Sequence, residues 1–283
     1  RGPLAPSFPR SLEPMSDLAE QEQPAVLCTD LSFTYDSRYV TQPALRSFNL
    51  NLPKGSRCLL IGANGSGKST ILRVLGGRHM AKPDEAVVVL GMNAFRDHRL
   101  NMQRAYLDMD WGMRTVSFAG HGVPLQADIA VKDMMVKLQN EHPERRDELI
   151  DMLGIDPEWR MHQVSDGQRR RVQLLLGLIR PFQILLLDEI TTSLDVIVRR
   201  DLLEWLEKES NERGATIIYA THIFDGLDGW PTHLTYLTAE GRTGWQGRVE
   251  ELPLYRELVE KKHPTPLLTI ACTWLRAERV RAR

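Results

Sequence analysis

The stretch Gly62-Ala-Asn-Gly-Ser-Gly-Lys-Ser-Thr70 decides the fold of this 283-residue chain. It fits the pattern G-x-x-x-x-G-K-[ST], whose four required positions are filled by Gly62, Gly67, Lys68 and Ser69. Residues 57–61 before it form an apolar run that predicts a buried strand, and residues 69–75 after it begin a helix. The glycines let backbone N–H groups wrap phosphates at a helix N-terminus, so we expect a phosphate-binding loop here.

Two residues of this loop have side chains suited to nucleotide chemistry. Lys68 would reach the β- and γ-phosphates, and the hydroxyl of Ser69 would bind Mg²⁺. The alternative is a glycine-rich strand–helix turn that binds nothing, but the matching strand, loop and helix favour nucleotide binding. The residues that the motif places around the phosphates are Gly62, Ala63, Asn64, Gly65, Ser66, Gly67, Lys68, Ser69 and Thr70.

The composition is that of an ordinary globular protein, with 26% charged and 42% hydrophobic residues and a net charge of −1. It therefore gives no strong signal for nucleic-acid or anionic-lipid binding. The three cysteines, Cys28, Cys58 and Cys272, lack metal-ligand spacing and favour a reducing compartment over a disulfide framework. No apolar run approaches the ~18 residues that span a bilayer, so we expect no integral membrane segment.

The segments ahead of the loop predict an antiparallel layer. Residues 25–35 and 44–52 alternate between apolar and polar side chains as strands do, and residues 87–90 are a further short apolar run. Residues 1–24 are rich in Pro, Ser and Glu without periodicity, and we expect them to form a disordered leader.

The middle of the chain predicts an inserted helical lobe. Residues 92–127 show no persistent period, whereas residues 128–153 have helical apolar spacing, with Gly154 as a plausible C-cap. Near the C-terminus, residues 267–275 form an amphipathic helix whose apolar face we expect to dock on the chain's own core, a partner surface being the alternative. We therefore expect a leader at residues 1–24 and a core domain at residues 25–248, with the lobe inserted at about residues 100–180. A C-terminal helical extension follows at residues 249–283.

Three polar residues follow buried strands. Residues 184–189 are a continuous apolar run that ends in Asp188 and Glu189, and residues 216–222 end in His222. Asp188 is placed to hold Mg²⁺ through water, and Glu189 to orient or deprotonate a water that attacks the γ-phosphate. His222 should end a strand beside that of Asp188, within reach of the γ-phosphate or this water. The alternatives are a solvated loop start for the two acids and a structural role for the histidine.

A second anion-binding helix N-terminus is predicted at residues 164–172. Ser165 and Gln168 have the spacing of a capping box, which by itself indicates only a well-capped helix. The hydroxyl of Ser165 and the backbone N–H of Gly167 could also cap a phosphate, because a helix N-terminus binds anions for the same reason that it needs a cap.

Together these segments resemble an ATP-binding cassette (ABC) ATPase over residues 25–248. The resemblance rests on the Walker A loop Gly62–Thr70, the signature-like Val164–Gln168, the Walker B strand Ile184–Glu189, the D-loop-like Ser193–Asp195 and the switch histidine His222. It implies an α/β fold of the P-loop NTPase class, with a mixed sheet core, an antiparallel β layer and an inserted helical lobe. It also implies that ATP and Mg²⁺ bind and that ATP is hydrolysed.

The resemblance assigns further residues and a stoichiometry. Tyr35 would be the aromatic residue that stacks on adenine, although it could equally be a sheet tyrosine. In this family ATP lies between two cassettes, and one supplies the Walker loops while the other supplies the signature. Ser165, Gly167 and Gln168 would therefore act on the nucleotide of a second cassette, most simply in a head-to-tail homodimer.

The sequence departs from the family pattern at two places. Asp166 stands where a glycine is usual, so its carboxylate must point away from the triphosphate or pair with Arg169 or Arg170. The glutamine that contacts Mg²⁺ in this family has no clear counterpart. Gln126 is the first candidate and Gln103 the second.

A narrower resemblance is carried by residues 159–168, 185–196 and 219–227. They look like a soluble subgroup without membrane domains: the I-type cassettes of plants and the fungal cassette associated with the deadenylase (Not) complex. This implies a cytoplasmic ATPase, with the nucleus as a further compartment, that switches a protein partner, such as the deadenylase (Not) complex, in gene-expression regulation. The alternatives are the detached nucleotide-binding subunit of a membrane transporter and a scaffold that binds ATP without hydrolysing it.

Overall fold

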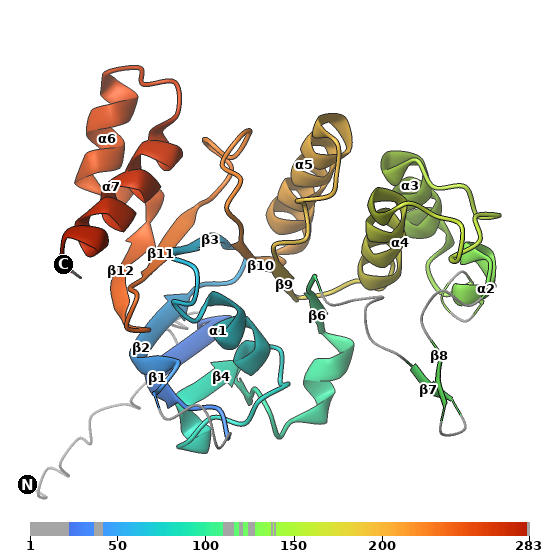
Figure 1. The fold of residues 1–283 in the computed structure, drawn as a ribbon, viewed down its shortest axis with the longest axis horizontal. Helices are drawn as coiled ribbons and strands as arrows, with labels where there is room; N and C mark the ends of the chain where they lie inside the picture. Colours follow the sequence, from blue (N-terminus) through green and yellow to red (C-terminus); the bar gives the residue numbers. More distant parts are fainter. Residues whose placement is uncertain are drawn as a thin grey trace, which may run out of the picture.

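The computed structural model describes residues 23–36, 42–109, 116–118, 121–123, 128–136, 138 and 140–281. Residues 1–22 of the expected leader lie outside the described part of the chain, and so does Gln126. Two sheets stack with helix α1 (Lys68–Leu75) between them, and the other long helices cover the far face of the larger sheet (Figure 1).

The smaller sheet is the antiparallel layer that the sequence predicts. Its strands follow the order β2-β1-β4-β5, and every neighbouring pair is antiparallel. Apolar side chains of this sheet pack on α1 and on one face of the larger sheet. The strands are β1 (Val26–Phe33), β2 (Leu45–Leu52), β4 (Val87–Val89) and β5 (Met92–Asn93).

The larger sheet has the order β12-β11-β3-β10-β9-β6, with only β12 antiparallel to its neighbour. Every residue of β3, β9, β10 and β11 is buried, as expected for strands covered on both faces. Because the strands β3, β9 and β10 are parallel, the residues that follow them meet at one edge of the sheet. The strands are β3 (Arg57–Gly62), β6 (Arg104–Leu107), β9 (Ile184–Asp188), β10 (Thr216–Ala220), β11 (His233–Leu237) and β12 (Thr243–Arg248).

Helices α4 (Asp166–Leu178), α5 (Val196–Arg213) and α7 (Pro266–Arg281) cover the far face of this sheet. In Figure 1 α4 and the lobe lie at one side, α5 lies in the middle, and α6 (Pro253–Glu260) with α7 lies at the other side. Within the described part of the chain no helix is long and apolar enough to cross a bilayer. Short elements complete the fold: 3₁₀ turns Asp84–Ala86, His98–Met102 and Val249–Glu251, and the hairpin of β7 (Val116–Phe118) and β8 (His121–Val123).

The lobe differs in detail from the sequence prediction. Residues 128–153 contain two helices, α2 (Val131–Met134) and α3 (Pro143–Leu153), because Pro143 starts a new helix after His142, whose dihedrals (φ −138°, ψ 64°) are not helical. Gly154 ends α3 with a φ of 57°, as predicted for a C-cap. Strand β6 belongs to the central sheet, although its residues fall within the stretch that the sequence assigns to the lobe.

A buried ion pair fastens the lobe to the core. The guanidinium of Arg145 on α3 lies 2.8 Å from Glu209 on α5, and both side chains are almost fully buried. The same guanidinium lies 4.6 Å from the ring centroid of Trp205. Breaking such a pair leaves an unpaired buried charge, so the orientation of α3 against α5 is strongly specified.

The C-terminal helix α7 docks on the chain's own core, as the sequence favours. Leu267, Ile270 and Ala271 are at most 1% exposed, and the ring of Trp274 stacks on Tyr236 of β11 at 4.7 Å. The basic residues Arg276 and Arg279 of this helix are exposed. Most of the amphipathic face predicted from the sequence is therefore buried, although Leu268 is 39% exposed.

Candidate active site

The phosphate loop, Asp188, Glu189 and His222 meet at the carboxyl edge of the central sheet. Strands β9 and β10 are paired so that Asp188 lies opposite Ala220, and the N–H of Glu189 donates to the carbonyl of Ala220 at 3.0 Å. This confirms the sequence prediction that the strand ending in His222 lies beside the strand ending in Asp188.

The loop between β3 and α1 is closed on itself by Lys68. The ammonium donates to the carbonyls of Gly62 and Ala63 at 2.8 and 3.1 Å, and the side chain is 7% exposed. Burial lowers the pKa of Lys68, while the nearby carboxylates of Glu189 and Asp188 oppose this shift. Gly67 has a φ of 103°, and a Cβ there would lie 2.7 Å from the carbonyl of Ala44, so the chain path requires glycine.

Ser69 and Asp188 supply the oxygen atoms expected of a magnesium site. The hydroxyl of Ser69 donates to Oδ1 of Asp188 at 3.1 Å, and burial raises the pKa of Asp188. Among the described residues, no group of three or more His, Cys, Asp or Glu side chains is placed to hold a metal ion by itself. These two groups fit Mg²⁺ rather than zinc, because Mg²⁺ is usually bound by one or two protein oxygens together with phosphate and water.

Glu189 and His222 form a contact pair above the loop. His222 Nε2 lies 3.0 Å from Glu189 Oε1, and the backbone N–H of His222 donates to Glu189 Oε2 at 3.2 Å. Glu189 has a φ of 56°, a left-handed backbone conformation that few non-glycine residues adopt. Burial raises the pKa of Glu189, and burial together with Lys68 lowers the pKa of His222. This is the pattern of a carboxylate base beside a neutral imidazole.

Tyr35 lies near the start of α1. Its hydroxyl is 2.9 Å from Thr70 Oγ1, and its ring makes edge contacts with Phe33 and His79 at centroid distances of 5.1 and 5.3 Å. His79 is an aromatic neighbour that no sequence pattern indicates. The half-buried Tyr35 is thus fixed beside the phosphate loop, where its ring could flank a base.

The signature-like segment does not reach the same chain's phosphate loop. Ser165 caps α4 and forms the predicted capping box, with Ser165 Oγ accepting from the N–H of Gln168 and Gln168 Oε1 accepting from the N–H of Ser165. Asp166 is 90% exposed and pairs with Arg169 at 3.1 Å, one of the two outcomes expected for it. Within the described residues no hydrogen bond or ion pair joins residues 165–168 to residues 62–70.

The structure excludes Gln103 as a metal contact and shows other residues beside Asp188. Gln103 precedes β6 at the amino edge of the sheet, where its carbonyl accepts from the N–H of Ile184 at 3.0 Å. At the carboxyl edge, Asp108 is bound by Arg78 at 2.6 Å, and its carbonyl accepts from Gln173 of α4 at 2.7 Å. No apolar run precedes Asp108, so only the sheet register reveals its position.

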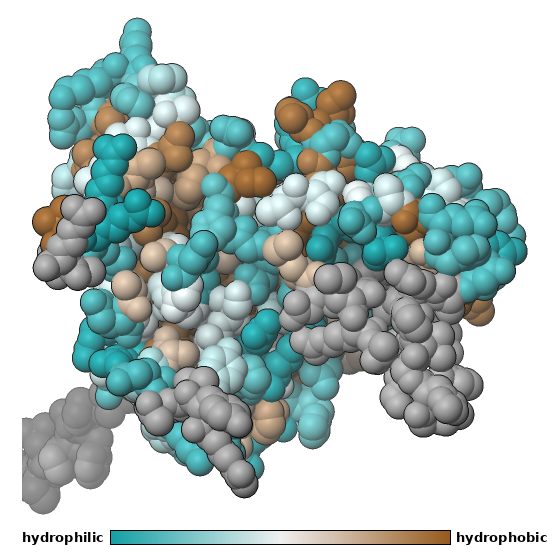
Figure 2. All heavy atoms as spheres, viewed as in Figure 1, coloured by the Kyte–Doolittle hydropathy of each residue, from teal (hydrophilic) through white to brown (hydrophobic). Residues whose placement is uncertain are grey.

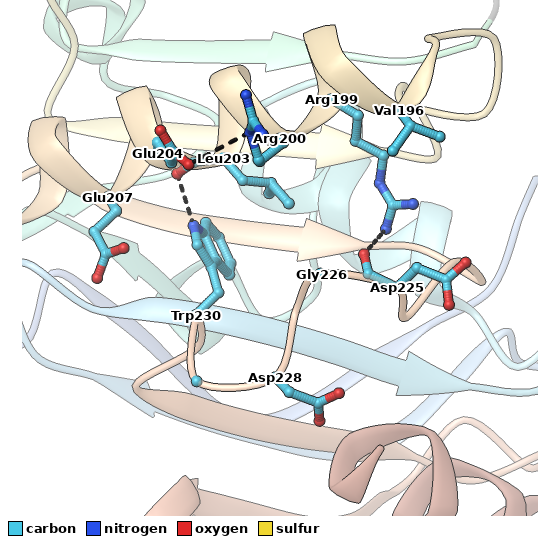
Figure 3. A pocket seen from close by; sticks show the side chains of 11 residues that line it. Val196, Arg199, Arg200, Leu203, Glu204, Glu207, Asp225, Gly226, Asp228 and Trp230 are labelled. Atoms are coloured by element: carbon cyan, nitrogen blue, oxygen red, sulfur yellow. Dashed lines mark hydrogen bonds and ion pairs between the residues drawn. The ribbon is translucent and has the colours of Figure 1, made fainter. Parts of the chain in front are cut away.

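Arg199 holds the segment that follows His222. Its Nη2 donates to the carbonyls of Ile223 and Asp225 at 3.0 and 2.6 Å. Figure 3 shows this side chain reaching from α5 to the loop across a cavity of about 550 Å³, whose floor includes Leu203 and Trp230. Because α5 begins directly after Asp195, Arg199 joins the D-loop-like segment to the loop that carries His222.

Comparisons with known proteins agree with this geometry. A family model described as "ABC transporter" matches residues 45–192. The chain is 50% identical to "ABC transporter I family member 20" of Arabidopsis thaliana, over 84% of this chain and 70% of the relative. It is 38% identical to "CCR4-associated factor 16" of Saccharomyces cerevisiae, over 73% of each chain. Both relatives belong to the subgroups that the sequence resembles.

Solved structures share the fold. The dimeric structure of a bacterial ABC transporter cassette superposes with a TM-score of 0.65 at 20% identity, over 79% of this chain and 98% of that one. A dimeric post-hydrolysis state of the same type of cassette, bound to ADP and Pi, gives a TM-score of 0.64 at 21% identity, with the same coverage.

Proposed function

The chain belongs to the ATP-binding cassette family and is an ATP hydrolase of that type, and we propose that two copies bind ATP between them, head to tail, and separate after hydrolysis. The observation that carries this proposal is a division of the site. Lys68, Asp188, Glu189 and His222 converge, whereas the capped N-terminus of α4 has no bond to the loop in its own chain. A second copy would supply that helix N-terminus. The dimeric forms of cassettes with the same fold support this stoichiometry.

The residues divide the chemistry of hydrolysis between them. Lys68 would leave the loop carbonyls and bind the β- and γ-phosphates. Glu189 would accept the proton of the attacking water, and the neutral imidazole of His222, held at 3.0 Å, would orient it and contact the γ-phosphate. Ser69 and Asp188 would hold Mg²⁺, which neutralises phosphate charge when bound.

The second copy would complete the γ-phosphate site. The hydroxyl of its Ser165 and the N–H of its Gly167 would cap that phosphate from the other side, where the helix dipole favours negative charge. Gln168 would keep this cap in place through its bond to Ser165. Loss of the γ-phosphate removes the group that both copies bind, so the dimer opens.

In this cycle the dimer closes on ATP and opens after hydrolysis, and this conformational change acts on a macromolecular partner in the cytoplasm. The likeness to "CCR4-associated factor 16" supports a partner in gene-expression regulation, such as the deadenylase (Not) complex. The second candidate is the nucleotide-binding subunit of a membrane transporter. The family description "ABC transporter" favours that candidate. Recovery of the endogenous protein in washed membranes rather than in the soluble fraction would support it.

The trapped variant Glu189→Gln tests the dimer. Removing the base should slow hydrolysis by about 10²–10⁴-fold while ATP still binds, so the dimer accumulates. Light scattering with saturating MgATP should give twice the chain mass. Lys68→Ala in the same background should stay monomeric, because it loses the contact to the β- and γ-phosphates. A Glu189→Gln protein that binds MgATP and remains monomeric would contradict the proposed dimer.

A further inference from the structure

A groove runs along α5 beside the loop that follows His222. Its cavity of about 550 Å³ lies between the helix and residues 225–230 (Figure 3). Leu203 and Trp230 form an apolar floor, and the indole N–H of Trp230 donates to the carbonyl of Leu203 at 3.0 Å. At one end Val196 is 84% exposed, and Figure 2 shows apolar surface over α5 on a mostly hydrophilic face. The groove therefore has a fixed apolar floor that the described part of the chain leaves open.

Acidic side chains border this floor on both sides. Glu204 and Glu207 come from α5, and Asp225 and Asp228 come from the loop that faces it (Figure 3). The side chains of Glu204 and Glu207 are 70% and 42% exposed, and both aspartates are exposed as well. A molecule that enters the groove thus meets four carboxylates around its rim.

The arginines near the groove neutralise this rim only in part. Arg57 lies 2.9 Å from Glu207, but Arg57 and Arg199 are at most 9% exposed, and both donate to backbone carbonyls. Arg200 is exposed and lies 3.6 Å from Glu204. A partner that brings several exposed positive charges would therefore complement the rim.

The length of the groove favours a peptide over a compact small ligand. The lining residues of α5 recur at helical spacing from Val196 to Glu207, which is about 16 Å along the helix axis. A second helix of about three turns has the same length. Such a helix lies in a groove through apolar side chains at i, i+3, i+4 and i+7. We therefore expect an occupant with an apolar stripe that is flanked by Lys or Arg.

The groove also contacts the loop that carries the catalytic histidine. Arg199 lines the cavity and donates to the carbonyls of Ile223 and Asp225, directly after His222. An occupant of the groove therefore lies against the side chain that fixes this loop. Coupling between two sites is reciprocal, so an occupant that shifts His222 would itself bind differently as the loop moves during the ATPase cycle.

We propose that this groove is the docking site of a protein partner, which it binds through a basic amphipathic helix. Docking there alters ATP hydrolysis through Arg199 and the loop that carries His222. The inference rests on the proposed function for the partner's identity, as the protein on which the ATPase acts, and it adds where that protein binds.

Selection from a displayed peptide library tests the docking. The peptides have about 14 residues, enough for three helical turns with flanking charges. The wild-type protein is used without nucleotide, so that neither dimerisation nor hydrolysis is needed. Enriched peptides should carry an apolar stripe with Lys or Arg beside it. The best one, labelled for fluorescence anisotropy, should bind about ten-fold more weakly when NaCl rises from about 0.05 to about 0.5 M, because salt screens the rim charges.

Charge reversal at the rim is the decisive variant. Glu204→Lys combined with Asp225→Lys should weaken binding of the labelled peptide about ten-fold or more, because attraction becomes repulsion. The matched control, Glu212→Lys with Glu260→Lys, makes the same change of charge at exposed positions outside the groove and should bind as wild type does. Equal binding by the two double variants, or a library without any peptide that is sensitive to the rim, overturns the inference.

A second copy of this chain is the other occupant to test. Peptide binding that is lost when MgATP is added to the Glu189→Gln protein would show that the second copy covers the groove, and would overturn the inference. Binding that persists in the trapped dimer supports an occupant from another protein.

The link to hydrolysis is measured with the same peptide. At saturation it should change kcat of the wild-type protein about two-fold or more, and it should leave kcat of Arg199→Met unchanged. A peptide that binds without changing kcat of the wild type contradicts the link to His222. If the protein hydrolyses no ATP but still binds the peptide through the rim, the proposed function fails and the docking site stands.

Discussion

At the scale of single residues, the proposed mechanism depends most on Glu189. Its carboxylate accepts a hydrogen bond from the backbone N–H of His222, and the His222 ring nitrogen Nε2 lies 3.0 Å from the other carboxylate oxygen. Its positive φ keeps the side chain at this position, where a flexible residue would turn to solvent. The position is fixed before ATP arrives, so little reorganisation is needed during the reaction.

The pH dependence of hydrolysis should report the raised pKa of Glu189. A base works only when deprotonated, so kcat/KM should fall as the pH drops through that pKa. Because burial raises the pKa, the loss should begin above the pH at which ordinary glutamates titrate, about 4.3. Steady-state measurements of kcat/KM for ATP hydrolysis by the wild-type protein, from about pH 4.5 to about pH 8, test this expectation.

A His222→Gln variant is the control for this profile. It should lower the plateau while an acid limb remains, since the titrating carboxylate is still present. A rate that stays level down to the range of ordinary glutamates would contradict the role of Glu189 as base.

Tyr35 can be tested for stacking against a purely structural role. Tyr35→Ala should weaken ATP binding by roughly ten-fold or more, because stacking a base on an aromatic ring contributes ~1–3 kcal/mol. Tyr35→Phe keeps the ring, loses the hydroxyl contacts to Thr70 and Arg73, and should bind nearly as well as wild type. Calorimetric titration with ATP checks both. Equal losses in the two variants would show that the hydroxyl, and not the ring, matters.

At the scale of elements, the central strands could be predicted because each is a continuous apolar run buried on both faces. Strands β3, β9 and β10 follow from this pattern, and their parallel order then places Asp188, Glu189 and His222 together. Strand β6 could not be predicted, since it is an edge strand whose first three residues are only half-buried. Strand β12 alternates between half-buried and exposed residues for the same reason.

Beyond the residues that end these strands, the candidate site was predictable only where the sequence signal is local. The phosphate loop and the capping box are short patterns whose chemistry does not depend on distant segments. Asp108 and Arg199 depend on which elements pack together, so the linear sequence contains no mark of their positions beside the site. The break between α2 and α3 was missed because apolar spacing continues through a proline that begins a new helix.

Arg199 should act as a positioning residue for the loop that carries His222. Arg199→Met removes the two hydrogen bonds to that loop and should lower kcat about ten-fold, because a misplacement of ~1 Å can cost up to ~10²-fold in rate. ATP affinity, which depends on the phosphate loop, should stay within a factor of about two of wild type. Single-turnover rates and ATP titrations separate the two effects.

The neighbouring arginine provides the control. Arg200 is exposed and pairs only with acidic residues of its own helix, so Arg200→Met should leave kcat unchanged. If both variants behave alike, or if Arg199→Met weakens ATP binding instead of kcat, the loop is not held by Arg199 as described.

At the scale of the whole molecule, the fold keeps the phosphate loop apart from the capped N-terminus of α4, the two parts that the proposed dimer joins into one active site. The phosphate loop and its catalytic residues lie at the carboxyl edge of the central sheet, while the capped helix α4 lies in the lobe that Arg145 and Glu209 fasten to the core. A single chain therefore contains every required group in an arrangement that does not close on itself. Two chains related by a two-fold axis would form two complete sites.

Mixing two inactive variants tests this sharing most directly. Lys68→Ala removes the phosphate contact of one half-site, and Ser165→Asp keeps a good helix cap while its charge repels the γ-phosphate in the other. Each protein alone should be inactive, but an equal mixture should regain ATPase activity, up to about half of the wild-type rate, because the dimers that form are mixed and each has one intact site of two. A mixture no more active than its separate components would contradict a site shared between two copies.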